Sequence, residues 1–131
     1  MKVIGLFREL GRGMDQSLPS IHLAAGALAP EQAALIAQYL RSGITVIDVM
    51  EASSDPLDGS KSISGGPSLL SDGVWVWRYD LPYYVEKYRV ALPEAFISYA
   101  LEKKVVAGLS SSIVSRWEEI LAAYELAERG G

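Results

Sequence analysis

The sequence contains no cysteine and only one histidine, His22. The lack of cysteine excludes thiol catalysis and thiolate metal sites, and one histidine would leave only carboxylates to complete a zinc site. A Ser-His-Asp triad would have to use His22, yet the G-x-S-x-G turn that carries the serine in many hydrolases is absent. We therefore predict no metal, no cofactor and no catalytic residues, and we interpret His22 as a helix-side residue without a catalytic role.

Long apolar runs are also missing. No run approaches the roughly 20 residues that cross a membrane as a helix. The apolar residues at the N-terminus are interrupted by Arg8 and Glu9, which leaves too short a stretch for a signal peptide. The sequence therefore predicts a cytoplasmic protein that does not use a membrane.

An excess of basic residues is absent as well, because the formal net charge is −4. The acidic bias is concentrated in residues 51–72, where Lys61 is the only basic residue and the acidic ones are Glu51, Asp55, Asp58 and Asp72. An acidic surface without a basic stripe argues against direct binding of nucleic acid. It favours a basic protein as the partner.

Half of the 131 residues are hydrophobic and 21% are charged, which predicts one globular domain over residues 1–131. Patterns of apolar residues predict strands at residues 2–8, 44–50, 68–71 and 74–78, and helices at 30–41, 93–104 and 112–129. Shorter helices are expected at 21–28 and from Leu81 onward, the latter capped by Asp80. The predicted fold class is α/β (α+β), with a small, mostly antiparallel sheet packed against three to four helices.

Two residues near the middle of the chain have specific expected places. Gly43 follows the helix at 30–41 and is expected to end it in the left-handed conformation. Asp48 is the one polar residue in the β-branched run of residues 44–50. It must either lie at the end of that strand or find a polar partner.

Residues 51–67 are rich in serine and glycine and predict a long acidic loop without regular structure. The loop lacks the spacing of a calcium-binding loop, and no lysine follows Gly65-Gly66 to make a phosphate site. Two interpretations remain. Either Asp55 and Asp58 are turn residues of a solvated loop, or they belong to an acidic patch that contacts a basic partner.

The turn signal Ser71-Asp72-Gly73 predicts a hairpin whose second strand places Trp75 and Trp77 on one face and Arg78 on the other. The two indoles could fill the core, as buried aromatic residues do. They could instead be exposed anchors of an interface, including one that joins two copies of this chain. The sequence leaves these alternatives open.

The same region carries a family resemblance. The matching positions are Ser71-Asp72-Gly73, Trp75, Trp77, Asp80-Leu81, Tyr83-Tyr84-Val85, Tyr88, Leu92-Pro93 and Phe96. They resemble a family of small bacterial proteins, abundant in actinobacteria, with the pattern (S/T)DG-x-W-x-W-x-x-DL-x-YYV-x-x-Y. The FRELG and DPLDG segments are similar too, so the resemblance spans residues from about 4 to 97. By size, acidity and lack of an active site, such proteins resemble immunity proteins that neutralise secreted bacterial toxins.

These observations lead to one functional hypothesis and one alternative. The hypothesis is a non-enzymatic protein-binding module, most concretely a toxin-neutralising immunity protein, with partner-binding residues Glu51, Asp55, Asp58, Asp72 and Arg78. The alternative is a small-molecule-binding or enzymatic domain whose pocket at the sheet edge is formed by Asp48, Asp72, Arg78 and Tyr84.

Overall fold

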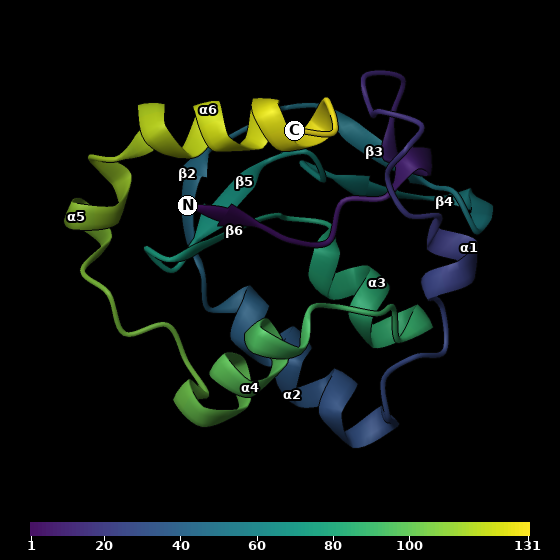
Figure 1. The fold of residues 1–131 in the computed structure, drawn as a ribbon, viewed down its shortest axis with the longest axis horizontal. Helices are drawn as coiled ribbons and strands as arrows, with labels where there is room; N and C mark the ends of the chain where they lie inside the picture. The colour runs from purple at the N-terminus through teal and green to yellow at the C-terminus, as the bar shows by residue number, and fades with distance from the viewer.

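The centre of the fold is a four-stranded mixed sheet, seen in a computed structural model that describes residues 1–131 (Figure 1). Its strands are β1 (Lys2–Val3), β2 (Ile44–Ile47), β5 (Leu69–Ser71) and β6 (Trp75–Arg78), in the order β1-β6-β5-β2. β1 pairs with β6 in parallel, and the other two pairings are antiparallel. Strands β3 (Ala52–Asp55) and β4 (Asp58–Ser64) form a separate hairpin. The predicted α+β class and mostly antiparallel sheet are confirmed.

Helices cover both faces of this sheet. They are α1 (Ile21–Ala24), α2 (Pro30–Arg41), α3 (Leu81–Tyr88), α4 (Glu94–Lys103), α5 (Ser110–Val114) and α6 (Trp117–Glu128), with a short 3₁₀ helix, η1 (Arg8–Leu10). In Figure 1, α6 lies on one side of the sheet and α2, α3 and α4 lie on the other. None of these helices is both long enough and apolar enough to cross a membrane.

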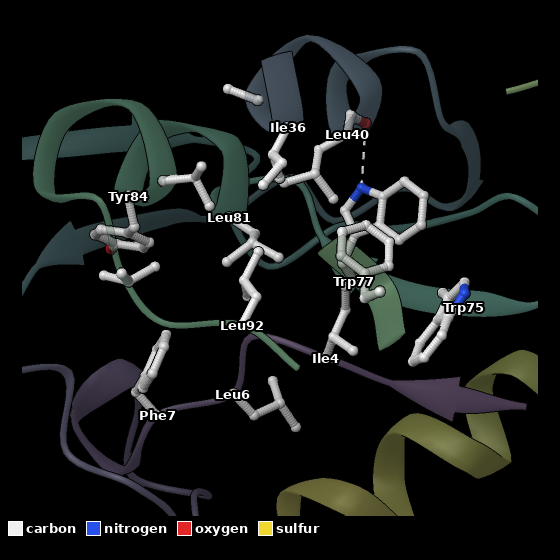
Figure 2. Packing of buried hydrophobic residues seen from close by; sticks show 14 of the residues in the cluster. Ile4, Leu6, Phe7, Ile36, Leu40, Trp75, Trp77, Leu81, Tyr84 and Leu92 are labelled. Carbon is white, nitrogen blue, oxygen red and sulfur yellow. Dashed lines mark hydrogen bonds between the residues drawn. The ribbon is translucent and has the colours of Figure 1, made fainter. Parts of the chain in front are cut away.

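Strand β6 shows why both faces are covered, because all four of its residues are buried. Trp77 packs toward α2, where its indole Nε1 donates to the carbonyl of Leu40 at 3.2 Å (Figure 2). Val76 points the other way and clusters with Ile113 of α5 and Ile120 of α6. The period-2 alternation of the strand therefore supplies two hydrophobic cores, one on each face.

The larger core is built around aromatic rings. The centroid of Trp77 lies 6.2 Å from that of Tyr39 and 6.0 Å from that of Phe96, distances typical of favourable aromatic pairs. Trp75 packs edge-on against Phe96 at 5.3 Å. Both tryptophans are buried, so the interpretation that they fill the core is confirmed. The interpretation of the two indoles as exposed interface anchors is wrong.

Gly43 is required for a reason that differs from the predicted one. Its φ is not positive, so it does not end α2 in the left-handed conformation. A Cβ atom at this position would instead lie 2.5 Å from Cζ2 of Trp77. The residue must be glycine because the indole of Trp77 packs directly against the backbone at the end of α2.

The segment 51–67 is not an irregular loop, and that prediction is wrong over most of its length. β3 and β4 pair in an antiparallel ladder from Ala52 opposite Ser64 to Asp55 opposite Asp58. Small polar residues give no alternation of apolar and polar side chains, which is the usual sequence signal of a strand. The hairpin is held by long-range polar contacts, which composition does not reveal.

Two other boundaries also differ from the prediction. The N-terminal strand ends at Val3 instead of residue 8, since Gly5 takes φ 72° and the chain then enters η1. The helix expected at 112–129 is divided into α5 and α6, because Arg116 leaves the helical region with φ −95° and ψ 21°. With this division and the two short helices α1 and α3, the structure has six α-helices, more than the three to four expected to pack against the sheet.

Candidate functional site

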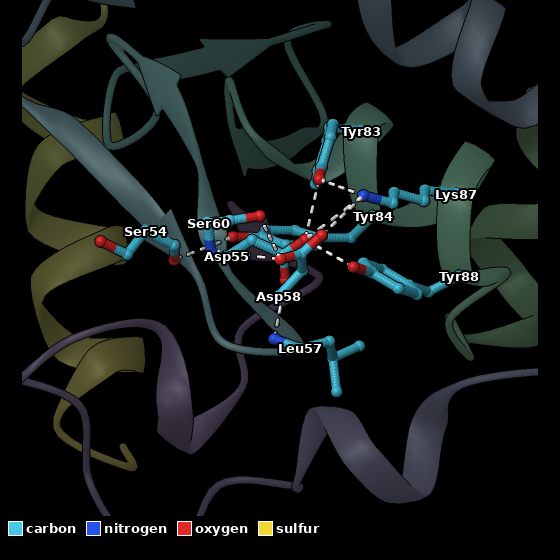
Figure 3. A network of polar contacts seen from close by, with 9 residues as sticks. All are labelled: Ser54, Asp55, Leu57, Asp58, Ser60, Tyr83, Tyr84, Lys87 and Tyr88. Carbon is cyan, nitrogen blue, oxygen red and sulfur yellow. Dashed lines mark hydrogen bonds and ion pairs between the residues drawn. The ribbon is translucent and has the colours of Figure 1, made fainter.

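Asp55 fixes the β3–β4 hairpin to α3 (Figure 3). Its carboxylate accepts hydrogen bonds from the hydroxyls of Tyr83 at 2.8 Å and Tyr88 at 2.6 Å, and from the backbone N–H of Leu57 at 2.7 Å. Burial alone would raise the pKa of Asp55, but these hydrogen bonds outweigh it and lower the pKa. The residue is 1% exposed, so its predicted role as a contact residue would require the hairpin to move.

Lys87 and Asp58 extend this network to the surface. The ammonium of Lys87 donates to the hydroxyl of Tyr83 at 3.0 Å and lies 3.8 Å from a carboxylate oxygen of Asp58. Desolvation and the carboxylate of Asp55 raise the pKa of Tyr88 to about 12. Tyr88 therefore keeps its proton and remains a hydrogen-bond donor at neutral pH.

Asp72 closes the turn between β5 and β6. Its carboxylate accepts from the backbone N–H groups of Val74 at 2.9 Å and Trp75 at 2.7 Å. The hydroxyl of Tyr39 donates to its second oxygen at 2.6 Å. Burial, aided by this carboxylate, raises the pKa of Tyr39. Asp72 is itself buried, and its hydrogen bonds join the turn to α2.

Arg78 and Asp80 form a buried ion pair, with side chains 4% and 1% exposed. The guanidinium donates through Nε at 3.1 Å and through Nη2 at 2.8 Å to the two carboxylate oxygens. Ser53 of β3 also donates to Asp80, at 2.9 Å. The sequence predicted that Asp80 caps α3, but its side chain makes no capping hydrogen bond. Both of its carboxylate oxygens are instead occupied by Arg78 and Ser53. Burial would lower the pKa of Arg78, but the charge of Asp80 outweighs burial and raises it. The positive charge of Arg78 is balanced by the negative charge of Asp80.

A cleft of about 670 Å³ opens above this ion pair. Its lining includes residues 51–54 at the start of the β3–β4 hairpin, residues 9–14, and Leu121, Tyr124 and Glu128 of α6. Arg78 and Leu69 reach it from the central sheet. In Figure 1, the loop after η1 and the C-terminal end of α6 lie beside β3. Three segments that are distant in the sequence thus enclose one concave surface.

The lining of the cleft is acidic. It includes the carboxylates of Glu9, Glu51 and Glu128, whereas Arg12 is its only cation besides the neutralised Arg78. The carboxylate of Glu9 already has partners, because its two oxygens accept hydrogen bonds from the hydroxyl of Ser20 and the backbone N–H of Ile21. Glu51 is exposed, Glu128 is half-buried, and neither forms an ion pair.

The five residues predicted to bind a partner do not lie together. Glu51 and Arg78 line the cleft, whereas Asp58 lies near α3 at the turn of the hairpin. Asp55 and Asp72 are buried in the two networks described above. Sequence reasoning missed Glu128 and Tyr124, which belong to the cleft but lie in the C-terminal helix. No local signal could have found them, since the cleft exists only where α6, residues 9–14 and β3 come together in the fold.

The small-molecule pocket predicted at the sheet edge does not form as expected. Of Asp48, Asp72, Arg78 and Tyr84, only Arg78 lines the cleft. Asp48 lies just after β2 and is exposed, with the hydroxyl of Ser68 donating to it at 3.4 Å. Tyr84 is buried and its hydroxyl reaches the carbonyl of Ser54 at 3.5 Å.

Comparisons with protein-family models, curated proteins and solved structures found no match to this chain. The resemblance to the bacterial family with the tryptophan and tyrosine pattern therefore stays a prediction. No group of three or more histidine, aspartate or glutamate side chains is placed to hold a metal ion. What the cleft offers chemically is a concave acidic surface with hydrogen-bond donors at its base.

Proposed function

We propose that this protein is a non-enzymatic protein-binding module that takes up a basic segment of its partner in the acidic cleft. The observation that supports this most directly is the pair Glu51 and Glu128, two unpaired carboxylates that line one cleft. The lining also holds two cations: Arg78 is neutralised by Asp80, and Arg12 forms no ion pair, so two unpaired carboxylates face one unpaired guanidinium.

Exposed charges at a binding site mainly affect the rate of association with the partner and the specificity of binding. Exposed carboxylates attract a basic surface over about a Debye length, roughly 8 Å at physiological salt, and speed its association. The hydrophobic side chains Leu69 and Leu121 inside the cleft would then supply the apolar contact that a stable complex needs. Of the four acidic residues in the segment 51–72, only Glu51 lines the cleft. The acidic charge of that segment therefore supports this role only in part.

The most concrete form of the proposal is a bacterial immunity protein that acts in the cytoplasm and covers a basic surface of a toxin. Small size, net negative charge and a concave acidic surface support it. This form makes a separate genetic prediction. Deleting the gene from its host should make the strain sensitive to the toxin encoded beside it, and unimpaired growth of the deletion strain under that toxin would contradict the immunity role.

The binding proposal is tested with displayed random peptides of about 12 residues, selected against the immobilised protein. We expect the enriched peptides to be rich in Lys and Arg, and their affinity to fall as salt is raised. The variant Glu51→Gln/Glu128→Gln should lower that affinity about tenfold, because it removes both free carboxylates of the cleft.

The matched control is Glu31→Gln/Glu102→Gln, which removes the same charge from exposed positions on α2 and α4, outside the cleft. It should leave the affinity within about twofold, since screening weakens distant charges. Enrichment of peptides without basic residues, or equal losses in the two double variants, would overturn the proposal.

A further inference from the structure

We infer that the open edge of β1 binds an extended, mainly apolar segment of a partner protein that carries one acidic residue. β1 is an edge strand of the central sheet, because β6 is its only strand neighbour. An unpaired sheet edge is the surface to which a peptide strand adds in many peptide-binding proteins. The site is separate from the acidic cleft, so the inference goes beyond the proposed function and does not depend on it.

A groove follows this edge of the sheet. It consists of two adjoining hollows of about 520 and 530 Å³, whose linings share Val3 and Ile4. The second hollow is also lined by Ala123 of α6 and by Trp75, which packs against Phe96 of α4. In Figure 1, α6 and α4 lie on opposite sides of the sheet. A hollow that touches residues from both sides and the edge strand between them lies along the edge itself.

The backbone groups of Val3 face the open edge. On either side of this residue, the N–H of Lys2 donates to the carbonyl of Val74 at 3.2 Å and the N–H of Ile4 donates to that of Val76 at 3.0 Å. Both of these bonds are made on the side of β6. Successive residues of a paired strand turn their N–H and C=O groups to opposite sides. The N–H and C=O of Val3 therefore point away from β6, where no other strand lies.

The next part of the chain leaves further donors unpaired. Gly5, Leu6 and Phe7 line the groove, and their N–H groups donate to no backbone or side-chain acceptor of the protein. Leu6 and Phe7 are 8% and 3% exposed, and the backbone donors of buried residues are normally paired. Pairing resumes at Arg8, whose N–H donates to the carbonyl of Pro19 at 3.0 Å. A peptide backbone alongside residues 3–7 would supply the missing partners.

Lys2 indicates the charge of the bound segment. It is the only charged side chain in the linings of the two hollows, and it forms no ion pair. Its ammonium lies over the ring of Trp75, 5.2 Å from the centroid. The indole Nε1 of Trp75, a residue that is 6% exposed and lines the groove, has no hydrogen-bond partner. An acidic side chain at this end of the groove would pair with the ammonium and bring an acceptor to the indole.

The sides of the groove indicate that the rest of the segment is apolar. Leu126 of α6 lines the second hollow and is 55% exposed, although it is a large hydrophobic residue. Pro93 and Ala95 line the same hollow from the other side of the sheet. Successive side chains of an added strand point to opposite faces, so apolar residues on one face cover Leu126 and those on the other face cover Pro93 and Ala95. Five extended residues, about 16 Å long, match the unpaired stretch of residues 3–7.

A second copy of this chain is a poorer occupant of the groove. Pairing of β1 with β1 of another copy would bring two Lys2 side chains to a groove whose lining offers no acidic side chain. Both cations would stay unpaired. The charge of the groove therefore favours a different protein, one that supplies the carboxylate.

The test selects displayed random peptides of about 12 residues against the protein and keeps those that bind Glu51→Gln/Glu128→Gln equally well, which sets aside ligands of the acidic cleft. We expect these peptides to carry apolar residues at alternating positions and one Asp or Glu. Their binding should slow amide exchange of Val3 and of at least one of residues 5–7, followed by ¹⁵N NMR, by about tenfold or more. N-methylation of the peptide amides, which blocks strand pairing, should lower the affinity about tenfold at every second central position.

Two variants with matched controls test the charge and the apolar side of the groove. Lys2→Gln should weaken the selected peptide about tenfold, whereas Lys61→Gln, at an exposed position on β4 outside the groove, should change the affinity by less than about twofold. Leu126→Ser should weaken it about fivefold. Leu35→Ser is its control, because Leu35 is 54% exposed but lies on α2, outside the groove. NMR spectra without peptide check that each variant is folded.

Each outcome supports or overturns strand addition at β1. Peptides that slow the exchange of Val3 and lose affinity with Lys2→Gln and Leu126→Ser support it. A selection that yields no peptide protecting Val3, or equal losses in the variants and their controls, overturns it. Protection of Val3 that appears without peptide and grows with protein concentration, together with a dimer in light scattering, would assign the edge to a second copy and overturn the inferred partner. The acidic cleft is tested separately, through Glu51 and Glu128.

Discussion

The hydroxyl of Tyr88 donates to the carboxylate of Asp55 at 2.6 Å and so joins α3 to a strand 33 residues earlier in the chain. A two-stranded hairpin is marginally stable by itself, and β3 and β4 hold few apolar residues. The bond to Tyr88 and its companion from Tyr83 therefore hold one wall of the cleft in place.

Replacing Asp55 by Asn should destabilise the protein by about 2 kcal/mol, since two phenols lose a charged acceptor and a buried amide gains donors without partners. Urea unfolding at pH 7 measures this change. Asp58→Asn is the matched control, because Asp58 is partly exposed and Asn can still accept from Ser60. Its effect should stay within about 0.5 kcal/mol. Equal losses in the two variants would show that Asp55 has no special role.

The contribution of Asp55 should also depend on pH, in a direction that its pKa determines. Its pKa is lowered in the folded protein, so the stabilisation is fully present above the unfolded value of about 3.9. It is lost as the pH falls through the folded value. The stability difference between wild type and Asp55→Asn should be constant from pH 5 to 7 and shrink below about pH 4. A difference that grew on acidification would contradict this assignment.

The ion pair between Arg78 and Asp80 should show strong coupling in a double-mutant cycle. Arg78→Met leaves a buried carboxylate without its cation and should cost about 3 kcal/mol. The double variant Arg78→Met/Asp80→Leu should be less destabilised than the sum of the two single variants, because neither charge remains unpaired. Thermal or urea unfolding of all four proteins gives the coupling energy. Additive losses would mean that the pair does not act as a unit.

Gly43→Ala should destabilise the fold by about 1–3 kcal/mol, since the added methyl group must displace the indole of Trp77. The change should also disturb the hydrogen bond from this indole to Leu40 and shift the tryptophan fluorescence. Gly59→Ala is the control, because a Cβ atom there has no neighbour within 4 Å. The same substitution is therefore expected to be nearly neutral at residue 59. Unfolding curves of both variants test the comparison.

Local signals predicted several elements well. Pro30 and the apolar side of the following residues indicated α2, whose bounds are Pro30–Arg41. The Ser71-Asp72-Gly73 turn indicated the β5–β6 hairpin, and Asp72 does close that turn with its carboxylate. In each case the determining contacts lie within a few residues, so periodicity and turn chemistry suffice.

The candidate site was predictable only in part. Glu51 was identified from the charge of its segment, and it does line the cleft. Asp55 and Asp72 carry the same charge in the sequence, but each is buried against tyrosines from distant helices. Charge density along a chain does not show which carboxylates find hydroxyl partners, and those partners decide whether a carboxylate is buried or exposed.

The sequence by itself determined the α+β class, the order of most elements and the acidity of residues 51–72, because these depend on periodicity, turn residues and composition. Only the tertiary structure decided that this segment is a hairpin and that Glu51 meets Glu128 at one cleft. The physical reason is the range of the interactions. The bonds from β3 to Asp80 and to α3 join residues 25 or more positions apart, and the cleft brings β3 together with the still more distant α6; such contacts leave no local pattern in the sequence.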